Sequence, residues 1–133
     1  MTKILSYIIS CFIALFASSC CEFPEPPLEN YTFCNNSSDV VYISEYASDY
    51  SDVIPKSVLN KINKVMPHNI CNLSISVPET SIGKNSLHNI IIMKGQVYEQ
   101  YGIEYVLKNE MYERCSFTYD DLRSKGYRIV YPQ

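Results

Sequence analysis

The chain has 133 residues, of which 47% are hydrophobic and 19% charged, and its formal net charge is −3. This length and composition suit a single globular domain that can bury a core. Lysine and arginine never form a run of five or more. Because phosphate binding needs clustered cations, we expect no nucleic-acid partner.

The first twenty residues have the pattern of a secretory signal that ends at a cysteine. Lys3 supplies a positive flank, residues 4–17 carry no charge, and small side chains precede Cys20. A charged start, an apolar centre and small residues at the end define the secretory pattern. A membrane-spanning helix needs roughly 20 apolar residues, so this run is short for a permanent span. The alternatives are an uncleaved membrane helix and a buried core helix.

The residues around the expected cut indicate a bacterial lipoprotein. Residues 17–19 are small, as a lipoprotein signal peptidase requires, and Cys20 supplies a thiol that can carry diacylglycerol. Cys21 is the alternative acylation site, and Ala17 stands where leucine is commonest. We therefore predict removal of residues 1–19 and anchoring through Cys20. Two or three fatty-acid chains such as palmitate hold a protein stably on a membrane, whereas one binds only marginally.

Residues 20–30 are predicted to be an acidic, proline-rich tether. Three prolines within residues 22–30 oppose helix and central strand. An extended chain at about 3.1 Å per residue would lift a domain clear of the lipid headgroups. Without Lys3 the mature chain has 10 basic residues (11 − 1) and 14 acidic ones, a net charge of −4. The expected location is the cell envelope, on the outer membrane.

Residues 31–133 are expected to form one mainly β domain, a sandwich of antiparallel sheets with one or two short helices. Short alternating segments separated by turn residues are typical of such folds. The turn-rich residues 35–39 predict that the first two strands form a hairpin. The predicted strands are residues 31–35, 40–46, 71–77, 88–93, 111–118 and 127–131.

Two of these strands have a predicted place in the fold. Residues 88–93 are apolar with little alternation, so we expect this strand at the centre of its sheet. In the last strand Tyr127, Ile129 and Tyr131 share one face, because side chains alternate along a strand. We therefore expect the last strand to complete the core.

The helices are predicted from spacing and capping, and an α+β fold is the alternative class. Apolar residues at helical spacing predict a short helix within residues 55–66. Thr118 and Asp121 have the spacing of a capping box, and Gly126 suits the left-handed end of the helix that follows. Residues 95–109 are rich in tyrosine and mixed in period.

Export makes disulfides possible for the cysteines that remain after acylation of Cys20. Four cysteines allow three full pairings, among which the sequence does not choose. Cys34–Cys71 is the preferred bridge because both residues adjoin strand-like runs, and it would close a loop of about 38 residues. The alternative is a pair of reduced thiols packed as small apolar groups. The four cysteines are Cys21, Cys34, Cys71 and Cys115.

No combination of cysteine and histidine predicts a catalytic or metal site. Cys115 with His68 or His88 would form a thiol–imidazole pair, but no nucleophile turn or orienting third residue accompanies them. A buried strand cysteine is the expected role. His68 and Cys71 offer two ligands, whereas zinc takes three or four protein ligands. We predict no catalytic residue, no metal and no cofactor.

The acidic residues give no firmer signal. Glu45, Asp49 and Asp52 lie close in sequence, as calcium ligands do, but no glycine bend or calcium-binding loop pattern accompanies them. Adjacent acids such as Asp120 and Asp121 are most often helix caps. We expect a solvated loop at the first group and a cap at the second.

Tyrosine is the one compositional excess. Eleven of the 12 tyrosines remain after removal of Tyr7 with the signal. Exposed tyrosines form binding faces, including sugar-stacking ones, but tyrosine is equally favoured on sheet faces. The chain has no tryptophan, which weakens the case for a sugar-binding face.

Residues 114–132 resemble the end of a family of small lipoproteins from Bacteroides-type bacteria. The shared features are a Thr-x-x-Asp-Leu turn and an aromatic residue before a strand that closes in Tyr-Pro. Tyr127 stands where that family usually has tryptophan, and Cys115 where it commonly has tyrosine. Residues 35–43 fit more loosely. The resemblance implies an envelope location and a compact β-rich domain; the family has no established activity, and no catalytic residues carry over.

Two functions remain open at this point. The first is a non-enzymatic, lipid-anchored domain that binds an envelope protein or glycan or has a structural role. The second is a small secreted hydrolase that uses carboxylates. Converging Asp and Glu side chains in a cleft favour the hydrolase, whereas a filled core favours the first function.

Overall fold

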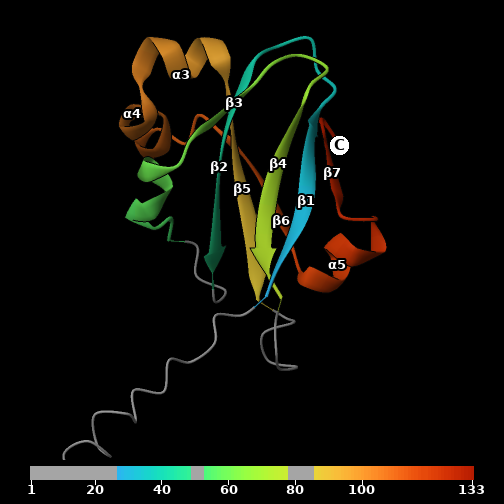
Figure 1. Ribbon diagram of the computed structural model, residues 1–133. Coiled ribbons are helices and arrows are strands. Elements are labelled where there is room, and N and C mark those ends of the chain that lie inside the picture. Colours follow the sequence, from blue (N-terminus) through green and yellow to red (C-terminus); the bar gives the residue numbers. More distant parts are fainter. Residues whose placement is uncertain (1–26, 49–52, 78–85) are drawn as a thin grey trace, which may run out of the picture.

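The computed structural model describes residues 27–48, 53–77 and 86–133, which form two sheets packed face to face (Figure 1). Sheet A has the order β4-β1-β7 and sheet B the order β3-β2-β5-β6. All pairings are antiparallel except that of β1 with β7. The predicted β-sandwich-like class is confirmed. The strands are β1 (Leu28–Asn35), β2 (Val41–Ser48), β3 (Asn63–Val65), β4 (Ile70–Ser76), β5 (Leu87–Lys94), β6 (Glu113–Phe117) and β7 (Arg128–Tyr131).

Short helices cover one face and one end of this sandwich. They are the 3-10 helix η1 (Lys56–Asn60) and the α-helices α3 (Gly95–Tyr101), α4 (Ile103–Lys108) and α5 (Tyr119–Ser124). Figure 1 shows α3 and α4 on the sheet B side and α5 beside β7. The described residues thus contain three α-helices where one or two short helices were expected. A left-handed Gly102, at φ 78°, separates α3 from α4.

The predicted hairpin of the first two strands is wrong, because β1 and β2 belong to different sheets. The turn after β1 carries the chain across the sandwich from sheet A to sheet B. Asn35, which is fully buried, holds this crossing: its amide nitrogen donates to the carbonyl oxygens of Asp39, Val65 and Met66 at 2.8, 3.2 and 3.2 Å. Turn residues announce a reversal but do not determine which sheet receives the next strand.

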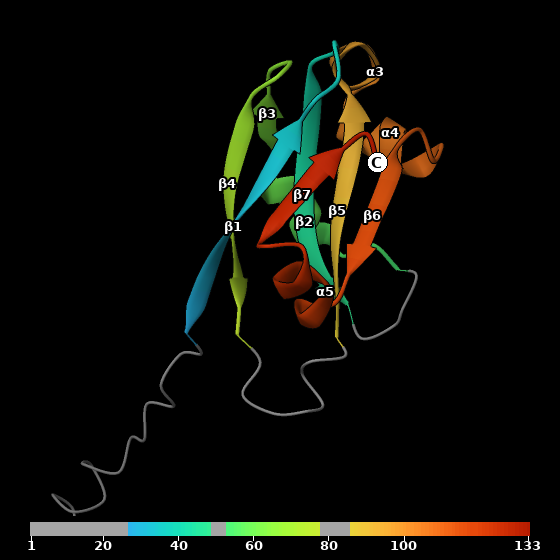
Figure 2. The same cartoon turned by 90° about the vertical axis from the view of Figure 1, so that its right-hand side faces the viewer.

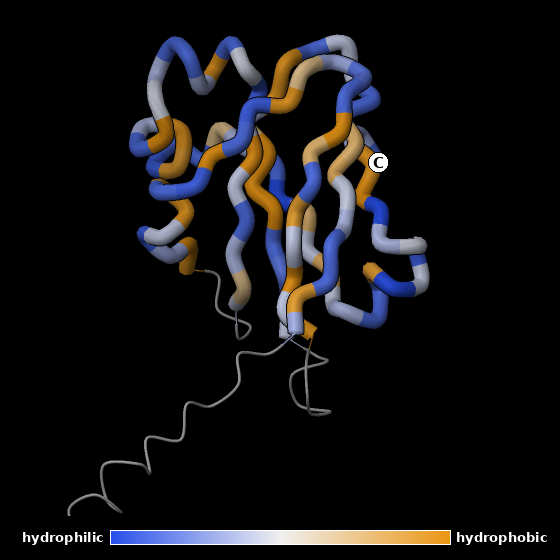
Figure 3. The backbone as a smooth tube through the Cα atoms, in the orientation of Figure 1, coloured by the Kyte–Doolittle hydropathy of each residue, from blue (hydrophilic) through white to orange (hydrophobic). Residues whose placement is uncertain are grey.

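The central position of β5 is confirmed, since it lies between β2 and β6. Ile90 and Ile92 face the core between the sheets, and Ile91 and Met93 face a second core under the helices. Burial on both faces explains why this strand is apolar without alternation. Figure 3 shows hydrophobic residues alternating with hydrophilic ones along other strands.

The helix predicted within residues 55–66 is replaced by η1 followed by β3. Val58 is buried in the second core, under the helices, whereas Val65 is buried in the core between the sheets. One continuous helix could not bury Val58 on one side of sheet B and Val65 on the other. The Ser44 hydroxyl donates to the carbonyl oxygens of Val58 and Lys61 at 2.9 and 3.0 Å, which fixes the end of η1.

The structure predicted for the C-terminal helix and the last strand is confirmed in its main features. Thr118 Oγ1 accepts from the Asp121 backbone N–H at 3.1 Å, and the Asp121 carboxylate accepts from the Thr118 N–H at 3.0 Å, a complete capping box. Gly126 has the expected left-handed φ of 67°. Ile129 and Tyr131 of β7 lie in the core between the sheets.

Candidate functional site

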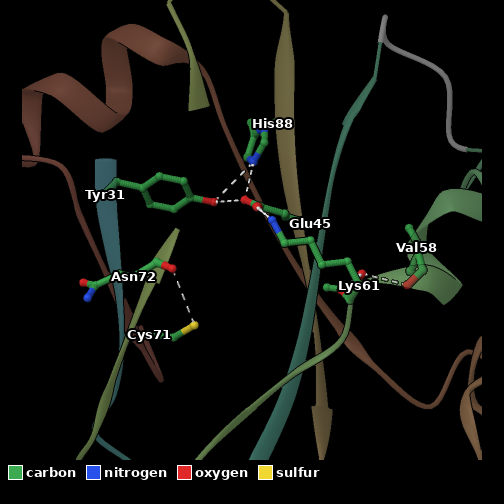
Figure 4. Close-up of polar contacts among 8 residues, drawn as sticks. Tyr31, Glu45, Val58, Lys61, Cys71, Asn72 and His88 are labelled. Carbon is green, nitrogen blue, oxygen red and sulfur yellow. Dashed lines mark hydrogen bonds and ion pairs between the residues drawn. The ribbon is translucent and has the colours of Figure 1, made fainter. Parts of the chain in front are cut away.

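A cluster of polar side chains in the interior joins three strands from both sheets. Tyr31 of β1 donates its hydroxyl hydrogen to Oε2 of Glu45 on β2 at 2.6 Å. Nε2 of His88 on β5 lies 3.1 Å from the same oxygen and 3.2 Å from the tyrosine oxygen. Figure 4 shows the three side chains converging. We call this group the Tyr31–Glu45–His88 clasp, because Tyr31 comes from sheet A and the other two residues from sheet B.

The distances determine where the hydrogens of the clasp lie. An ionised carboxylate only accepts hydrogen bonds, so Nε2 of His88 must carry a hydrogen toward Glu45. Either the Nε2-protonated neutral imidazole or the imidazolium satisfies this requirement. Both donors therefore point at one carboxylate oxygen of Glu45.

Glu45 remains ionised in spite of its burial. Burial acts to raise the pKa of Glu45, but hydrogen bonds from His88 and Tyr31 and the charges of His88 and Lys61 outweigh it, so the pKa lies below its ordinary value. Lys61 Nζ is 3.7 Å from Oε1, at the solvent-exposed side of the clasp. Burial and the bond to Glu45 raise the pKa of Tyr31, which therefore stays protonated.

This arrangement suits fastening better than hydrolysis. A general acid needs a raised pKa so that it carries a proton near neutral pH, and Glu45 has the opposite shift. Burial raises the pKa of the Cys71 and Cys115 thiols, which opposes the thiolate that a nucleophile needs. The Cys115 sulfur accepts a hydrogen bond from the Gln133 side-chain amide at 3.2 Å, and His88 bonds instead to Tyr31 and Glu45.

Other tyrosines of the chain repeat the Tyr31–Glu45 contact. Tyr131 of β7 donates to Glu113 of β6 at 3.3 Å, which again links sheet A to sheet B. Tyr119 of α5 donates to Glu29 of β1 at 2.8 Å. These rings are buried in the core between the sheets, so packing accounts for part of the tyrosine excess. On the helical layer Tyr101 and Tyr105 stack at 4.7 Å between centroids and are 43% and 47% exposed.

The remaining candidate residues are not assembled into a site. Glu45 faces the interior, while Asp49 and Asp52 lie outside the described residues. Asp121 caps α5, as expected. His68 lies between β3 and β4 with a left-handed φ of 59°. Of the residues that the structure describes, no group of three or more His, Cys, Asp or Glu side chains is placed to hold a metal ion.

The cysteines do not form the preferred bridge in the structure, where Cys34, Cys71 and Cys115 are free thiols. In the pairing of β1 with β4, Cys71 lies opposite Phe33 and Cys34 opposite Ile70. Directly opposed residues share a face and successive residues alternate, so Cys34 and Cys71 point to opposite faces of sheet A. The register thus opposes a Cys34–Cys71 disulfide. Cys20 and Cys21 lie outside the described residues.

The clasp itself was not predicted, although part of its signal lies in the sequence. Glu45 has the same strand phase as the apolar Val41 and Ile43, which marks it as an inward-facing acid. Its donor Tyr31 comes from the other sheet, so only the packing of the two sheets identifies the pair.

Comparisons with known proteins yield no relatives: no family model matches the chain, and no match is found among curated proteins or solved structures. Within the described residues, no helix has the length and hydropathy needed to cross a membrane.

Proposed function

We propose that this protein is a lipid-anchored component of the cell envelope, held on the outer membrane through Cys20, whose domain has a non-enzymatic binding or structural role. The signal pattern that ends at Cys20 supports the anchor, as does the resemblance of residues 114–132 to small envelope lipoproteins. Only seven residues separate Cys20 from the start of β1 at Leu28. The domain is therefore expected close to the membrane surface.

The use of two glutamates, the largely buried Glu45 and the exposed Glu113, carries the non-enzymatic part of this proposal. Glu45 and Glu113 each accept a tyrosine hydroxyl that crosses from sheet A, so both serve as fasteners between the sheets. A carboxylate hydrolase needs two carboxyl groups that converge on a substrate and differ in protonation. The lowered pKa of Glu45 and its three close polar neighbours weigh against that alternative.

The anchor also gives the domain an orientation. β1 begins at the end of the sandwich where β2 and β4 finish, and α3 lies at the opposite end (Figure 1). An anchor just before β1 places the β1 start near the membrane. The turn after β1, the β3–β4 turn and α3 then face away from the membrane and are open to partners.

Replacement of the predicted lipid-bearing cysteine tests the anchor. Cys20→Ala should abolish fatty-acid labelling and leave an uncleaved or mis-sorted precursor, whereas Cys21→Ala, the matched control, should be labelled and cleaved normally. Labelling that persists in Cys20→Ala and disappears in Cys21→Ala would move the anchor to Cys21. Labelling that persists in both single variants would show that Cys20 is not the sole acylation site, and a wild-type chain without label would refute the anchor.

The binding role requires a separate measurement in intact cells with the anchor retained. Crosslinking followed by purification in detergent should recover one defined envelope partner with the wild-type chain. If the purified chain instead cleaves envelope glycan, and Glu45→Gln abolishes that cleavage without unfolding the domain, the hydrolase alternative is correct.

A further inference from the structure

A hollow of about 470 Å³ lies beside the last strand of the domain. β7 is an end strand of sheet A, and Figure 2 shows it in front of sheet B, with β1 on its left and β6 farther to its right. The hollow therefore follows a free sheet edge. Its lining residues are Lys125, Arg128, Ile129, Val130 and Gln133.

The backbone of β7 is oriented for pairing with a further strand. The Thr32 N–H donates to the Tyr127 carbonyl at 3.0 Å, and the Asn36 N–H donates to the Tyr131 carbonyl at 2.7 Å. Backbone groups alternate in direction along a strand, so those of Arg128 and Val130 point away from β1. Both residues line the hollow, which places the N–H and C=O groups of this edge against it.

The side chains that line the hollow include two cations and no acid. Among the described residues, neither Lys125 nor Arg128 takes part in an ion pair. The nearby acids already have partners: Asp121 accepts from the Thr118 N–H, and Glu113 accepts from Tyr131. The charge of Lys125 also helps to lower the pKa of Asp121, but neither cation is fixed in an ion pair, so both can approach a ligand.

Arg128 is also held in place for such a role. Its Nε–H donates to the Cys34 sulfur at 3.1 Å, which fixes the stem of the side chain over β1. Arg128 nevertheless lines the hollow and is exposed. A guanidinium offers five donors in a planar fork that matches a carboxylate.

We propose that β7 binds an extended acidic segment of a partner protein, which adds to sheet A as a fourth strand. Main-chain hydrogen bonds to Arg128 and Val130 would supply affinity, and Lys125 and Arg128 would select carboxylates. An edge arginine normally discourages pairing with other strands, and here it leaves an acidic strand as the favoured class. A second copy of β7 is disfavoured because it would bring another Arg128 to the interface. This inference rests on the proposed binding role but not on acylation of Cys20.

Peptide binding to the full chain in detergent tests the proposal. The probe is a short, end-blocked, fluorescent peptide of alternating Glu and Thr, measured by anisotropy. A peptide with Gln in place of Glu removes the charge, and a Glu–Thr peptide methylated at every backbone nitrogen keeps the charge but removes the donors. The variants are Lys125→Gln and Arg128→Gln, with Lys108→Gln at the exposed end of α4 as the matched control.

We expect the Glu–Thr peptide to bind and both altered peptides to fail. Each of Lys125→Gln and Arg128→Gln should weaken binding roughly two- to five-fold, as loss of one exposed ion pair does, and Lys108→Gln should have no effect. Lys125 lies at the exposed end of α5, so its variant remains a fair test even if Arg128→Gln unfolds.

Several results would overturn the proposal. One is failure of the Glu–Thr peptide to bind, and another is equally strong binding of the methylated peptide. A third is competition by free glutamate that is as strong as competition by the peptide. The last is a dimer of the chain whose stability changes in Arg128→Gln, which would make a second copy the occupant. These results leave fatty-acid labelling untouched, so failure of strand addition is distinguishable from failure of the Cys20 anchor.

Discussion

The two buried layers on either side of sheet B use polar side chains in different ways. Between the sheets, Tyr31 and Tyr131 of sheet A donate to the carboxylates of Glu45 and Glu113 on sheet B. These bonds cross from one sheet to the other. The clasp at Glu45 also includes a buried charge, whose carboxylate is only 11% exposed.

The buried contacts between sheet B and the helices use neutral groups instead, whereas the bond of Tyr42 to Glu99 on α3 is exposed. The Ser44 hydroxyl donates to two backbone carbonyls at the end of η1. Asn89, on the same face of sheet B, accepts from the Ser116 hydroxyl at 2.6 Å. Neutral groups cost less to bury than a carboxylate, which is tolerated only when it is paired. The comparison indicates that the two sheets are held in one relative position by charge-assisted bonds, whereas the helices are held mainly by apolar packing.

Removal of residues 127–133 should have the largest effect on stability, because it removes β7 and with it the cross-sheet bond of Tyr131 to Glu113. The deletion removes Ile129 and Tyr131 from the core and exposes the edge of β1. Burying one isoleucine side chain contributes roughly 1.5–3 kcal/mol to a domain stability of about 5–15 kcal/mol. We expect loss of the cooperative melt by circular dichroism, with fatty-acid labelling retained. Deletion of Gln133 alone is the control, and a truncated chain with the full-length melting temperature would show that β7 is dispensable.

Tyr31→Phe should have the next largest effect, since it removes one donor of the clasp and keeps the ring. A buried hydrogen bond to a charged group contributes about 1.5–3 kcal/mol, and we expect a loss of this size in urea unfolding with an unchanged m-value. A double-mutant cycle with Glu45→Gln measures the coupling directly. If the two losses simply add, the hydroxyl and the carboxylate do not stabilise one another.

Acid should weaken the contact between the sheets through Glu45. The pKa of Glu45 is lower in the folded chain than its ordinary value of 4.5, so the folded state binds fewer protons. The stability it contributes is fully present above that ordinary value and is lost as the pH falls through the folded pKa. Melting temperatures measured from neutral pH into this acidic range should fall less steeply for Glu45→Gln than for wild type. Asp121, whose pKa is lowered by hydrogen bonds with Thr118, stays in both proteins, so equal slopes would show that Glu45 does not contribute.

Features encoded by neighbouring residues could be predicted from the sequence. The capping box needs only Thr118 and Asp121, three positions apart, and the central place of β5 follows from its own apolar run. The inward direction of Ile129 and Tyr131 follows from alternation along one strand. In each case the information lies within a few residues.

Features that depend on which elements meet could not be predicted. The turn after β1 has the composition of a hairpin turn, yet Asn35 bonds to backbone near the end of β3 and directs β2 into the other sheet. Residues 55–66 have helical spacing, yet Val58 and Val65 face different cores. The clasp combines both difficulties, because its members come from three strands and two sheets.

Tyr42→Phe should have the smallest effect on stability. It gives the most direct comparison between a tyrosine–glutamate bond outside the sandwich and the bond of Tyr31 between the sheets. Tyr42 lies on the outer side of sheet B and donates to Glu99 at 2.8 Å in an exposed hydrogen bond. Phenylalanine keeps the ring that stacks on Tyr98 at 4.1 Å between centroids, so the variant removes only the hydroxyl. Water replaces an exposed donor at little cost, whereas it cannot reach the buried bond of Tyr31. We expect the melting temperature of Tyr42→Phe to equal that of wild type within the reproducibility of the scan, in contrast to Tyr31→Phe. Equal losses in the two variants would mean that burial between the sheets adds nothing to a tyrosine–glutamate bond, and the distinction between the two layers would be lost.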